Sequence, residues 1–481
     1  MFLKIKVCWL IPVIMLLSGL QQSVAQNGNV KPNVLFITVD DLRPELGCYG
    51  NNIIKSPNID ALADEGVKFD RAYAQVPVCG ASRASMHTGI RPSRTRFTKA
   101  GSEIDHDTPG AVTMGQYFRE NGYYTLSFGK VIHGKYDAAK RSWSEYYPAE
   151  NMFEYHNAEN VAFNNNPQNG YKHAAPFEIT PNEVPDEAFL DVRTMQRVNK
   201  KLEELKTKDQ PFFLAVGFAR PHLPFVAPQR FWELYGEEDI KEPDNYFLPK
   251  DVPKIALSSW GELRAYKGIP KKGNIDDRQM RLNLKHGYYA SVSFTDYLVG
   301  RVIEKLKSLD LYDNTIIVIW GDHGWQLGEH MMWAKHTDFD IALRVPLIIK
   351  APGKLKGATS RELVEMVDIY PTLSELAGLP VRKANQGISL VSLLESEDGK
   401  AGSFALSRWK AGDSYKTDRY RYTEFTNKEG EIIARMLYDH RTDPEENVNV
   451  ADLPRYRPVV DSLSRALHRV QSAFNLETKV K

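Results

Sequence analysis

The strongest constraint on how this chain folds is a set of short, uninterrupted apolar runs that are rich in β-branched residues. The clearest is VLFITV at residues 34–39, directly after Lys31-Pro32-Asn33. Such a run indicates a strand with both faces buried, because neither set of its alternating side chains meets water. Similar runs occupy residues 211–218, 315–320 and 345–350. The sequence therefore predicts a sheet that is covered on both faces.

Stretches with a helical spacing of apolar residues separate these runs. The longest covers about residues 280–309, where Val292, Thr295, Val299, Val302 and Leu306 recur at that spacing. The others cover residues 59–65, 113–121 and 188–205. Strands that alternate with helices are typical of a mostly parallel sheet between helical layers, so we predict an α/β fold.

A change of pattern near residue 380 indicates a second, smaller unit. A short helix is expected at residues 368–377, and the Gly, Pro and Lys residues of 378–387 mark a boundary. The later elements are short, half-polar strands at 405–409, 420–425 and 432–438 and an amphipathic helix at 459–474. We therefore predict a catalytic domain at residues 26–380 and a C-terminal subdomain at 381–481, with a small antiparallel sheet and a covering helix.

Residues 146–185 have no periodicity and are rich in Asn, Pro and aromatic residues. We interpret them as a long excursion over the surface. Excursions of this length often shape binding sites.

The first 25 residues have the pattern of a signal peptide. Lys4 and Lys6 precede an apolar stretch at residues 7–20, and Ser23-Val24-Ala25 offers small residues for cleavage after Ala25. The apolar stretch is short for a membrane span, which needs about 20 residues. We therefore expect a periplasmic or secreted protein with no stable membrane insertion after cleavage.

The charge of the chain is balanced. Its formal net charge is +1, from 62 Lys and Arg against 61 Asp and Glu. The chain lacks the excess of basic residues that indicates a nucleic-acid partner, so binding of an anionic ligand must depend on local charges.

Acidic residues follow two of the predicted strands. Asp40 and Asp41 end the first run, and Asp322 and His323 end the run at 315–320. Ligand sites of α/β sheets lie at the carboxyl ends of strands, and adjacent carboxylates repel each other unless a cation neutralises them. One Asp could instead cap a turn. The carboxylate majority favours Ca²⁺ or Mg²⁺, although an imidazole ligand is unusual for either.

Cys79 stands in the segment Val78-Cys79-Gly80-Ala81-Ser82-Arg83, at the expected start of a helix. With an Arg four residues on, it could be a thiol nucleophile with a lowered pKa, or a buried structural residue. Of the three cysteines, Cys8 is in the predicted signal peptide. Cys48 and Cys79 could also pair in an oxidising compartment.

Taken together, these motifs resemble the type I sulfatases and, within them, the iduronate-2-sulfatase branch. The resemblance covers nearly the whole chain after the signal peptide. It implies the alkaline-phosphatase-superfamily fold, an α/β/α sandwich with a smaller C-terminal α+β subdomain. The matching segments are NVLFITVDDLRPELGCYG at 33–50, SPNID at 56–60, CGASR at 79–83, GYYTLSFGK at 122–130 with His133, RPHLPF at 220–225, GDHGWQLGEH at 321–330 and WAK at 333–335.

The resemblance implies that Cys79 is oxidised to formylglycine by a maturation enzyme, and that the hydrated aldehyde is the nucleophile. Ala81 stands where the usual maturation signal has Pro, an alternative known among bacterial members. The resemblance also implies one divalent cation, expected to be Ca²⁺. Its ligands would be Asp40, Asp41, Asp322, His323 and the residue at position 79.

Cationic side chains are expected around the sulfate, since sulfuryl transfer spreads negative charge over its oxygens. By the resemblance, Arg83 holds the hydrated aldehyde, while Lys130 and Lys335 bind the sulfate. His222 donates a proton to the leaving alkoxide and also contacts the substrate, and His133 accepts a proton from the nucleophile's second hydroxyl. Read without the resemblance, Lys130 is a surface lysine, His133 a loop cap and His222 a turn residue.

The expected substrate is a sulfated oligosaccharide derived from glycosaminoglycans. We predict an exo-acting 2-O-sulfatase for a terminal iduronate or unsaturated uronate, because Asp322-His323 matches the iduronate-sulfatase branch where many sulfatases have Asp-Asn. The alternatives are a phosphate or phosphonate monoester hydrolase of the same superfamily and a non-catalytic protein that binds sulfated glycans.

Overall fold

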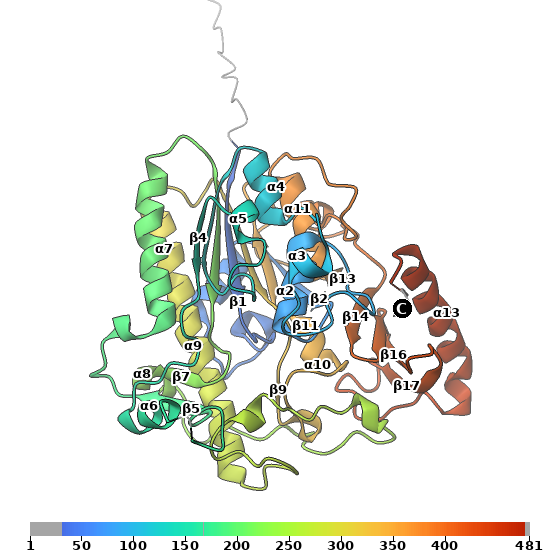
Figure 1. The fold of residues 1–481 in the computed structure, drawn as a ribbon. Coiled ribbons are helices and arrows are strands. Elements are labelled where there is room, and N and C mark those ends of the chain that lie inside the picture. The colour runs from blue at the N-terminus through green and yellow to red at the C-terminus, as the bar shows by residue number, and fades with distance from the viewer. Residues whose placement is uncertain (1–30, 167, 477–481) are drawn as a thin grey trace, which may run out of the picture. The chain divides into compact units, whose positions relative to one another are not determined.

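A mixed sheet of nine strands forms the centre of the computed structural model, which describes residues 31–166 and 168–476 (Figure 1). The predicted signal peptide lies outside the described residues. The strand order is β11-β2-β12-β8-β1-β6-β3-β4, with β13 paired to β2. The strands are β1 (Asn33–Val39), β2 (Val67–Tyr73), β3 (Tyr124–Gly129), β4 (Glu145–Pro148), β6 (Phe212–Phe218), β8 (Thr315–Gly321), β11 (Arg344–Val345), β12 (Leu347–Lys350) and β13 (Ala358–Glu365).

The predicted parallel pairing holds for one part of this sheet. Strands β8, β1, β6, β3 and β4 run parallel to one another, whereas β12 is antiparallel to both β8 and β2. The predicted strand at 345–350 is divided into β11 and β12 at Pro346, which has no N–H to give to the ladder.

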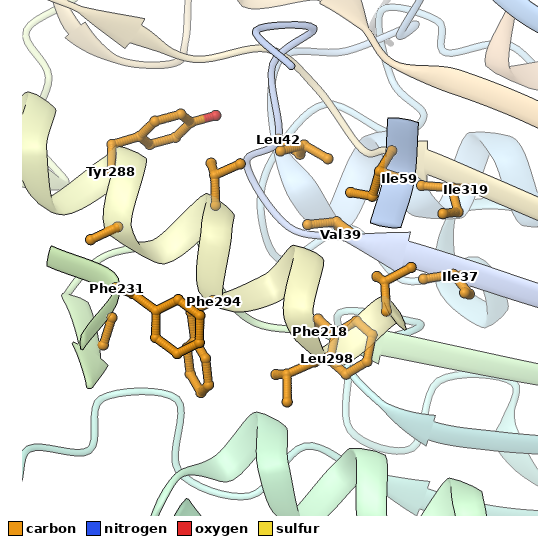
Figure 2. Packing of buried hydrophobic residues seen from close by; sticks show 14 of the residues in the cluster. Ile37, Val39, Leu42, Ile59, Phe218, Phe231, Tyr288, Phe294, Leu298 and Ile319 are labelled. Carbon is orange, nitrogen blue, oxygen red and sulfur yellow. The ribbon is translucent and has the colours of Figure 1, made fainter. Parts of the chain in front are cut away.

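Both faces of β1 are buried, and each meets a different layer of helices. Leu35, Ile37 and Val39 belong to a core cluster with α1 (Pro57–Asp64), α7 (Leu190–Lys206) and α9 (Arg278–Ser308). Val34 and Phe36 belong to a second cluster with α2 (Cys79–Thr88), α4 (Met114–Glu120) and α11 (Ile369–Leu376). Figure 2 shows the first cluster, where side chains of α9 pack beside the end of β1. The α/β/α sandwich is confirmed.

The predicted helices lie within a few residues of their expected bounds because their ends carry local signals. The Asp277 side chain accepts hydrogen bonds from the amides of Gln279 and Met280 at the start of α9. Thr113 accepts one from the amide of Gln116 at the start of α4. Such caps satisfy amides that have no partner within the helix.

The C-terminal part forms the expected antiparallel sheet with one covering helix. Its strands are β14 (Ala405–Trp409), β15 (Gly412–Lys416), β16 (Tyr420–Thr426) and β17 (Ile432–Asp439), in that order. Helix α13 (Arg457–Ala473) buries Leu463 and Leu467 against Tyr422 and Leu437. The sequence did not indicate β15. The boundary at 380/381 stays a prediction.

The excursion at 146–185 has more regular structure than its sequence indicates. It contains α6 (Ala158–Asn164) and β5 (Phe177–Thr180), and β5 pairs with β7 (Phe225–Pro228). Buried Glu178 accepts hydrogen bonds from the His156 amide at 2.7 Å and from Asn160 at 2.8 Å, which ties the excursion together.

Shorter elements complete the fold, and several of them border the site described below. They are α3 (Ile104–Asp107), α5 (Ala139–Ser142), α8 (Gln229–Trp232), α10 (Asp340–Leu343), α12 (Val391–Glu395), β9 (Gln326–Leu327) and β10 (Trp333–Ala334). No helix in the described part of the chain combines the length and apolar character that crossing a bilayer requires.

Candidate active site

The acidic residues of the two predicted strand ends lie side by side. Strands β1 and β8 pair in register up to Val39 and Gly321, so Asp40 and Asp41 leave the sheet next to Asp322 and His323. All four side chains are fully buried. The backbone of Asp41 has a positive φ of 59°, a conformation that Asp adopts more readily than most residues. The sheet edge therefore gathers three carboxylates and an imidazole at one point.

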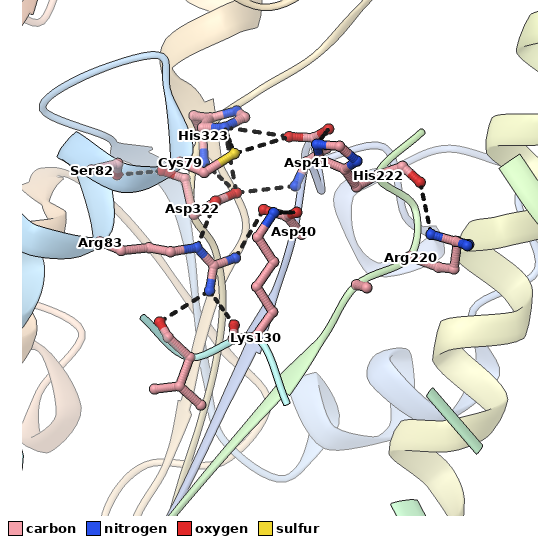
Figure 3. A network of polar contacts seen from close by, with 12 residues as sticks. Asp40, Asp41, Cys79, Ser82, Arg83, Lys130, Arg220, His222, Asp322 and His323 are labelled. Carbon is pink, nitrogen blue, oxygen red and sulfur yellow. Dashed lines mark hydrogen bonds and ion pairs between the residues drawn. The ribbon is translucent and has the colours of Figure 1, made fainter. Parts of the chain in front are cut away.

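Cys79 is the first residue of α2, and its thiol faces these ligands (Figure 3). Its Sγ lies 3.2 Å from His323 Nε2, 3.9 Å from Asp41 Oδ1 and 3.3 Å from Lys335 Nζ. Burial, together with nearby Asp40, raises the pKa of the Cys79 thiol well above its usual range. An unmodified thiol here is protonated, which disfavours the thiolate nucleophile considered from the sequence. Cys48 and Cys79 are both free and form no disulfide.

Arg83 lies one turn into α2 and is fully buried. Its Nη2 is 3.0 Å from Asp40 Oδ1 and its Nε is 2.9 Å from Asp322 Oδ2, so one guanidinium joins carboxylates from two strands (Figure 3). Its Nη1 donates to the carbonyls of Lys130 and Val131. That Arg83 also binds the hydrated aldehyde stays a prediction.

The donor set fits a divalent cation. The possible ligand atoms of Asp40, Asp41, Cys79 and His222 lie within 4.8 Å of one another, and so do those of Cys79, Asp322 and His323. Asp41 Oδ2 is buried and has no hydrogen-bond partner among the described residues. A buried carboxylate oxygen without a partner is costly, and a cation would satisfy it. The oxygen majority suits Ca²⁺ or Mg²⁺.

The two predicted sulfate-binding lysines are buried beside this acidic cluster. Lys130 follows β3 and pairs with Asp40, while Lys335 follows β10 and lies 2.8 Å from Asp41 Oδ1. Burial alone would lower the pKa of each lysine, but the neighbouring Asp raises it, to well above the usual range for Lys335. Likewise, burial would raise the pKa of Asp40, but Lys130 and Arg83 hold it well below its usual range. These groups are therefore charged.

The two predicted proton-transfer histidines lie on the side of the site where a cavity of about 390 Å³ opens. His222 follows β6; its Nδ1 is 2.6 Å from the Leu223 carbonyl and its Nε2 is 3.9 Å from Asp41 Oδ2. His133 lines the same cavity with Lys130. Partial burial and the charge of Lys130 lower the pKa of His133 to about 4, so its ring is neutral near pH 7 and able to accept a proton.

Two residues near the site had no signal in the sequence. Glu262 lies 2.8 Å from His222 Nε2 and 3.2 Å from Lys335 Nζ, and it comes from a stretch without periodicity or motif. Phe153, in the excursion at 146–185, stacks on His173 at 4.3 Å and meets the His222 ring edge-on at 6.2 Å. The structure thus brings together every residue predicted for the site and adds these two.

Comparisons with known proteins agree with this geometry. Residues 32–379 match the sulfatase family model, and residues 328–473 match the model for the C-terminal part of N-sulphoglucosamine sulphohydrolase. Iduronate 2-sulfatase of Mus musculus is 37% identical over 404 residues, which are 75% of this chain and 71% of that protein. A sulfatase of Formosa agariphila is 32% identical over 469 residues, 93% of this chain and 88% of that protein.

Among solved structures, the phosphonate monoester hydrolase of Silicibacter pomeroyi shares the fold, with a TM-score of 0.74 and 24% identity. The likeness covers 92% of this chain and 95% of that one. The close sequence relatives are sulfatases, which favours sulfate ester hydrolysis over the alternative of a non-catalytic glycan-binding protein. The chain belongs to the sulfatase family, in the branch similar to iduronate 2-sulfatase, and hydrolyses sulfate esters.

Proposed function

We propose that this sulfatase is exported, that it uses Ca²⁺ and a formylglycine made from Cys79, and that it removes the 2-O-sulfate from a terminal uronate of glycosaminoglycan oligosaccharides. The observation that carries the proposal is the convergence of Cys79 with three buried carboxylates and with two buried lysines. A buried cysteine, carboxylate or lysine alone does not indicate this reaction, whereas sulfuryl transfer at position 79 requires all of them together.

Formylglycine at position 79 would supply, as its hydrate, an oxygen nucleophile, and Ca²⁺ held by Asp40, Asp41, Asp322 and His323 would supply positive charge beside it. The chain's own cations then act on the sulfate. Lys130, which pairs with Asp40, and Lys335, which pairs with Asp41, stabilise the charge that grows on the sulfuryl oxygens. Arg83 keeps the carboxylates of Asp40 and Asp322 in place.

Proton transfers fall to the two histidines. His222 presents Nε2 toward the site and gives a proton to the leaving sugar oxygen, which is too basic to depart as an alkoxide. His133, with a pKa of about 4, is neutral and takes a proton from the hydroxyl that remains at position 79. Loss of that proton lets the sulfate depart and restores the aldehyde.

The substrate part of the proposal is supported by the relative named iduronate 2-sulfatase and by the cavity next to the site. This cavity of about 390 Å³ can take a sugar ring, and its lining includes Lys130, Lys135, His133 and Phe153. A uronate brings a carboxylate close to its 2-O-sulfate, and Lys135 offers a cation for it. Phe153 offers an apolar face for the ring.

The experiment is a comparison of 2-O-sulfated and 6-O-sulfated unsaturated disaccharides as substrates of the purified protein. We expect sulfate release from the 2-O-sulfated uronate. Activity confined to the 6-O-sulfated sugar would contradict the proposed specificity. Aryl sulfate and aryl phosphate esters, assayed in parallel, test the phosphate or phosphonate alternative, for which the shared fold is the only support.

A further inference from the structure

Glu262 connects two side chains that the proposed mechanism assigns to different tasks. Its Oε1 lies 2.8 Å from Nε2 of His222, the proposed acid, and its Oε2 lies 3.2 Å from Nζ of Lys335, the proposed sulfate ligand. One carboxylate therefore contacts both the group that protonates the leaving oxygen and a group that binds the sulfate, and it fixes the distance between them.

Glu262 completes the hydrogen bonding of Lys335. An ammonium group has three N–H donors. Two of them face Asp41 Oδ1 at 2.8 Å and Cys79 Sγ at 3.3 Å, and the third faces Glu262 Oε2. Without Glu262, the ammonium of this buried lysine would lose one of the three contacts that fix its position.

Glu262 also sets the direction of the His222 ring. Nδ1 is 2.6 Å from the Leu223 carbonyl, which only accepts hydrogen bonds. Nε2 faces a carboxylate oxygen, which likewise only accepts. These two contacts fix the plane of the ring, with Nε2 also 3.9 Å from Asp41 Oδ2.

The backbone around Glu262 is anchored, so the carboxylate is held in place. Trp260, Leu263 and Tyr266 are buried in the core, while the Glu262 side chain is 22% exposed. Burial would raise the pKa of Glu262, but Lys335 and His222 hold it well below its usual range, and the carboxylate is ionised.

We propose that Glu262 is a positioning residue of the sulfatase reaction, which orients the His222 ring and the Lys335 ammonium toward the same sulfate ester. The inference rests on the acid role proposed for His222. It implies that loss of Glu262 harms substrates in proportion to the basicity of their leaving group, because only a basic oxygen needs the proton from Nε2. A residue with a purely structural role would affect all substrates alike.

The test compares 4-nitrophenyl sulfate, whose leaving group needs no acid, with phenyl sulfate, whose leaving group is more basic. We expect Glu262→Gln to lower kcat for phenyl sulfate by on the order of 10- to 100-fold and for 4-nitrophenyl sulfate by much less. Glu262→Asp, which keeps the charge, should recover part of the loss. Glu159→Gln is the matched control, since Glu159 forms an exposed ion pair with Lys267 at 3.0 Å outside the site.

A double variant identifies the partner through which Glu262 acts. In a His222→Ala background, Glu262→Gln should no longer change the ratio of the two rates, because the group it orients is gone. Equal losses of kcat on both esters, or no loss on either, would overturn the inference. If Glu262→Gln has a lower Tm than the wild type, the same two rates are compared in Glu262→Asp. Neither ester contains a sugar, so the result does not depend on the proposed 2-O specificity. The proposed function is judged separately, by sulfate release from the 2-O-sulfated disaccharide.

Discussion

The backbone amide of Asp41 donates a 3.0 Å hydrogen bond to the carboxylate of Asp322, although 281 residues separate them in the chain. This bond joins the ends of β1 and β8 at the point where both strands leave the sheet. Arg83 joins the same two strand ends from α2, through Asp40 and Asp322. One backbone hydrogen bond and one guanidinium, both buried, thus tie the two strand ends together.

Replacement of Arg83 by Met should therefore destabilise the whole fold. The change leaves Asp40 and Asp322 buried with fewer partners, and a broken buried ion pair costs about 3–5 kcal/mol. We expect a clearly lower Tm in calorimetry. Arg193→Met is a suitable control, because Arg193 pairs with Glu150 and Glu154 near the surface. Equal Tm values for the two variants would contradict this account.

Position 79 should carry formylglycine in active protein. The residue is roughly 18 Da lighter than Cys, and a mass spectrum of the peptide containing position 79 measures the difference. Cys79→Ala should abolish turnover, while Cys48→Ala, at the other free cysteine, should leave it unchanged. Full activity in a preparation whose peptide has the mass of Cys would rule this nucleophile out.

Removal of divalent cations should abolish activity, and Ca²⁺ should restore it. A crystal structure should show one ion at Asp40, Asp41 and Asp322, with oxygen distances of about 2.3–2.6 Å. The described residues contain another group of possible ligands, Asp340, His440 and Glu446. There Arg421 already neutralises the acids, at 2.6 Å from Asp340 and 3.1 Å from Glu446. Asp340→Asn should therefore leave the calcium requirement intact, and a zinc signal at the first site would contradict our assignment.

His87 should make the fold sensitive to acid. Its ring is fully buried between Phe36 and Trp143, and burial together with Arg83 lowers its pKa to about 3. Above about pH 6.5 neither the folded nor the unfolded state binds the proton, so this residue has no effect there. Between pH 6.5 and 3 only the unfolded state binds it, so the free energy of unfolding falls as pH falls.

His87→Leu should remove this contribution. The slope of unfolding free energy against pH should decrease by about 1.4 kcal/mol per pH unit between pH 6 and 4. Denaturant titrations at several pH values measure the slope, which is independent of the fixed cost of the substitution. An unchanged slope would show that the ring is protonated in the folded protein.

Phe153 should contribute to sugar binding and not to sulfuryl transfer. Its ring lines the cavity beside His222, and we expect Phe153→Ala to raise KM for the disaccharide with little change for 4-nitrophenyl sulfate. Phe163 belongs to the same excursion but packs against the core and does not line this cavity, so Phe163→Ala is the control. A parallel rise of KM for both substrates would assign Phe153 to the support of His222.

The sequence predicted the elements that owe their structure to a local pattern. Strand β1 could be recognised because most of its side chains are apolar, and the ligands followed from their place at the ends of β1 and β8. Strand β15 (GDSYK) could not, since it has no apolar alternation and its backbone bonds come from β14 and β16 on either side. The role of Glu262 could not be predicted for a related reason. Its role depends only on His222 and Lys335, which are distant in the chain, and no periodicity marks the stretch that carries it.

The burial of Cys79 has a consequence for the order of events in the life of the protein. The side chain is 3% exposed, and every residue of α2 is buried. An enzyme that oxidises this thiol must reach it, and the folded protein leaves almost none of its surface exposed. The proposed conversion must therefore precede the packing of α2 against the sheet. The fraction of active molecules then depends on the relative rates of modification and folding during synthesis. Later incubation of the folded protein with the maturation enzyme will not change this fraction.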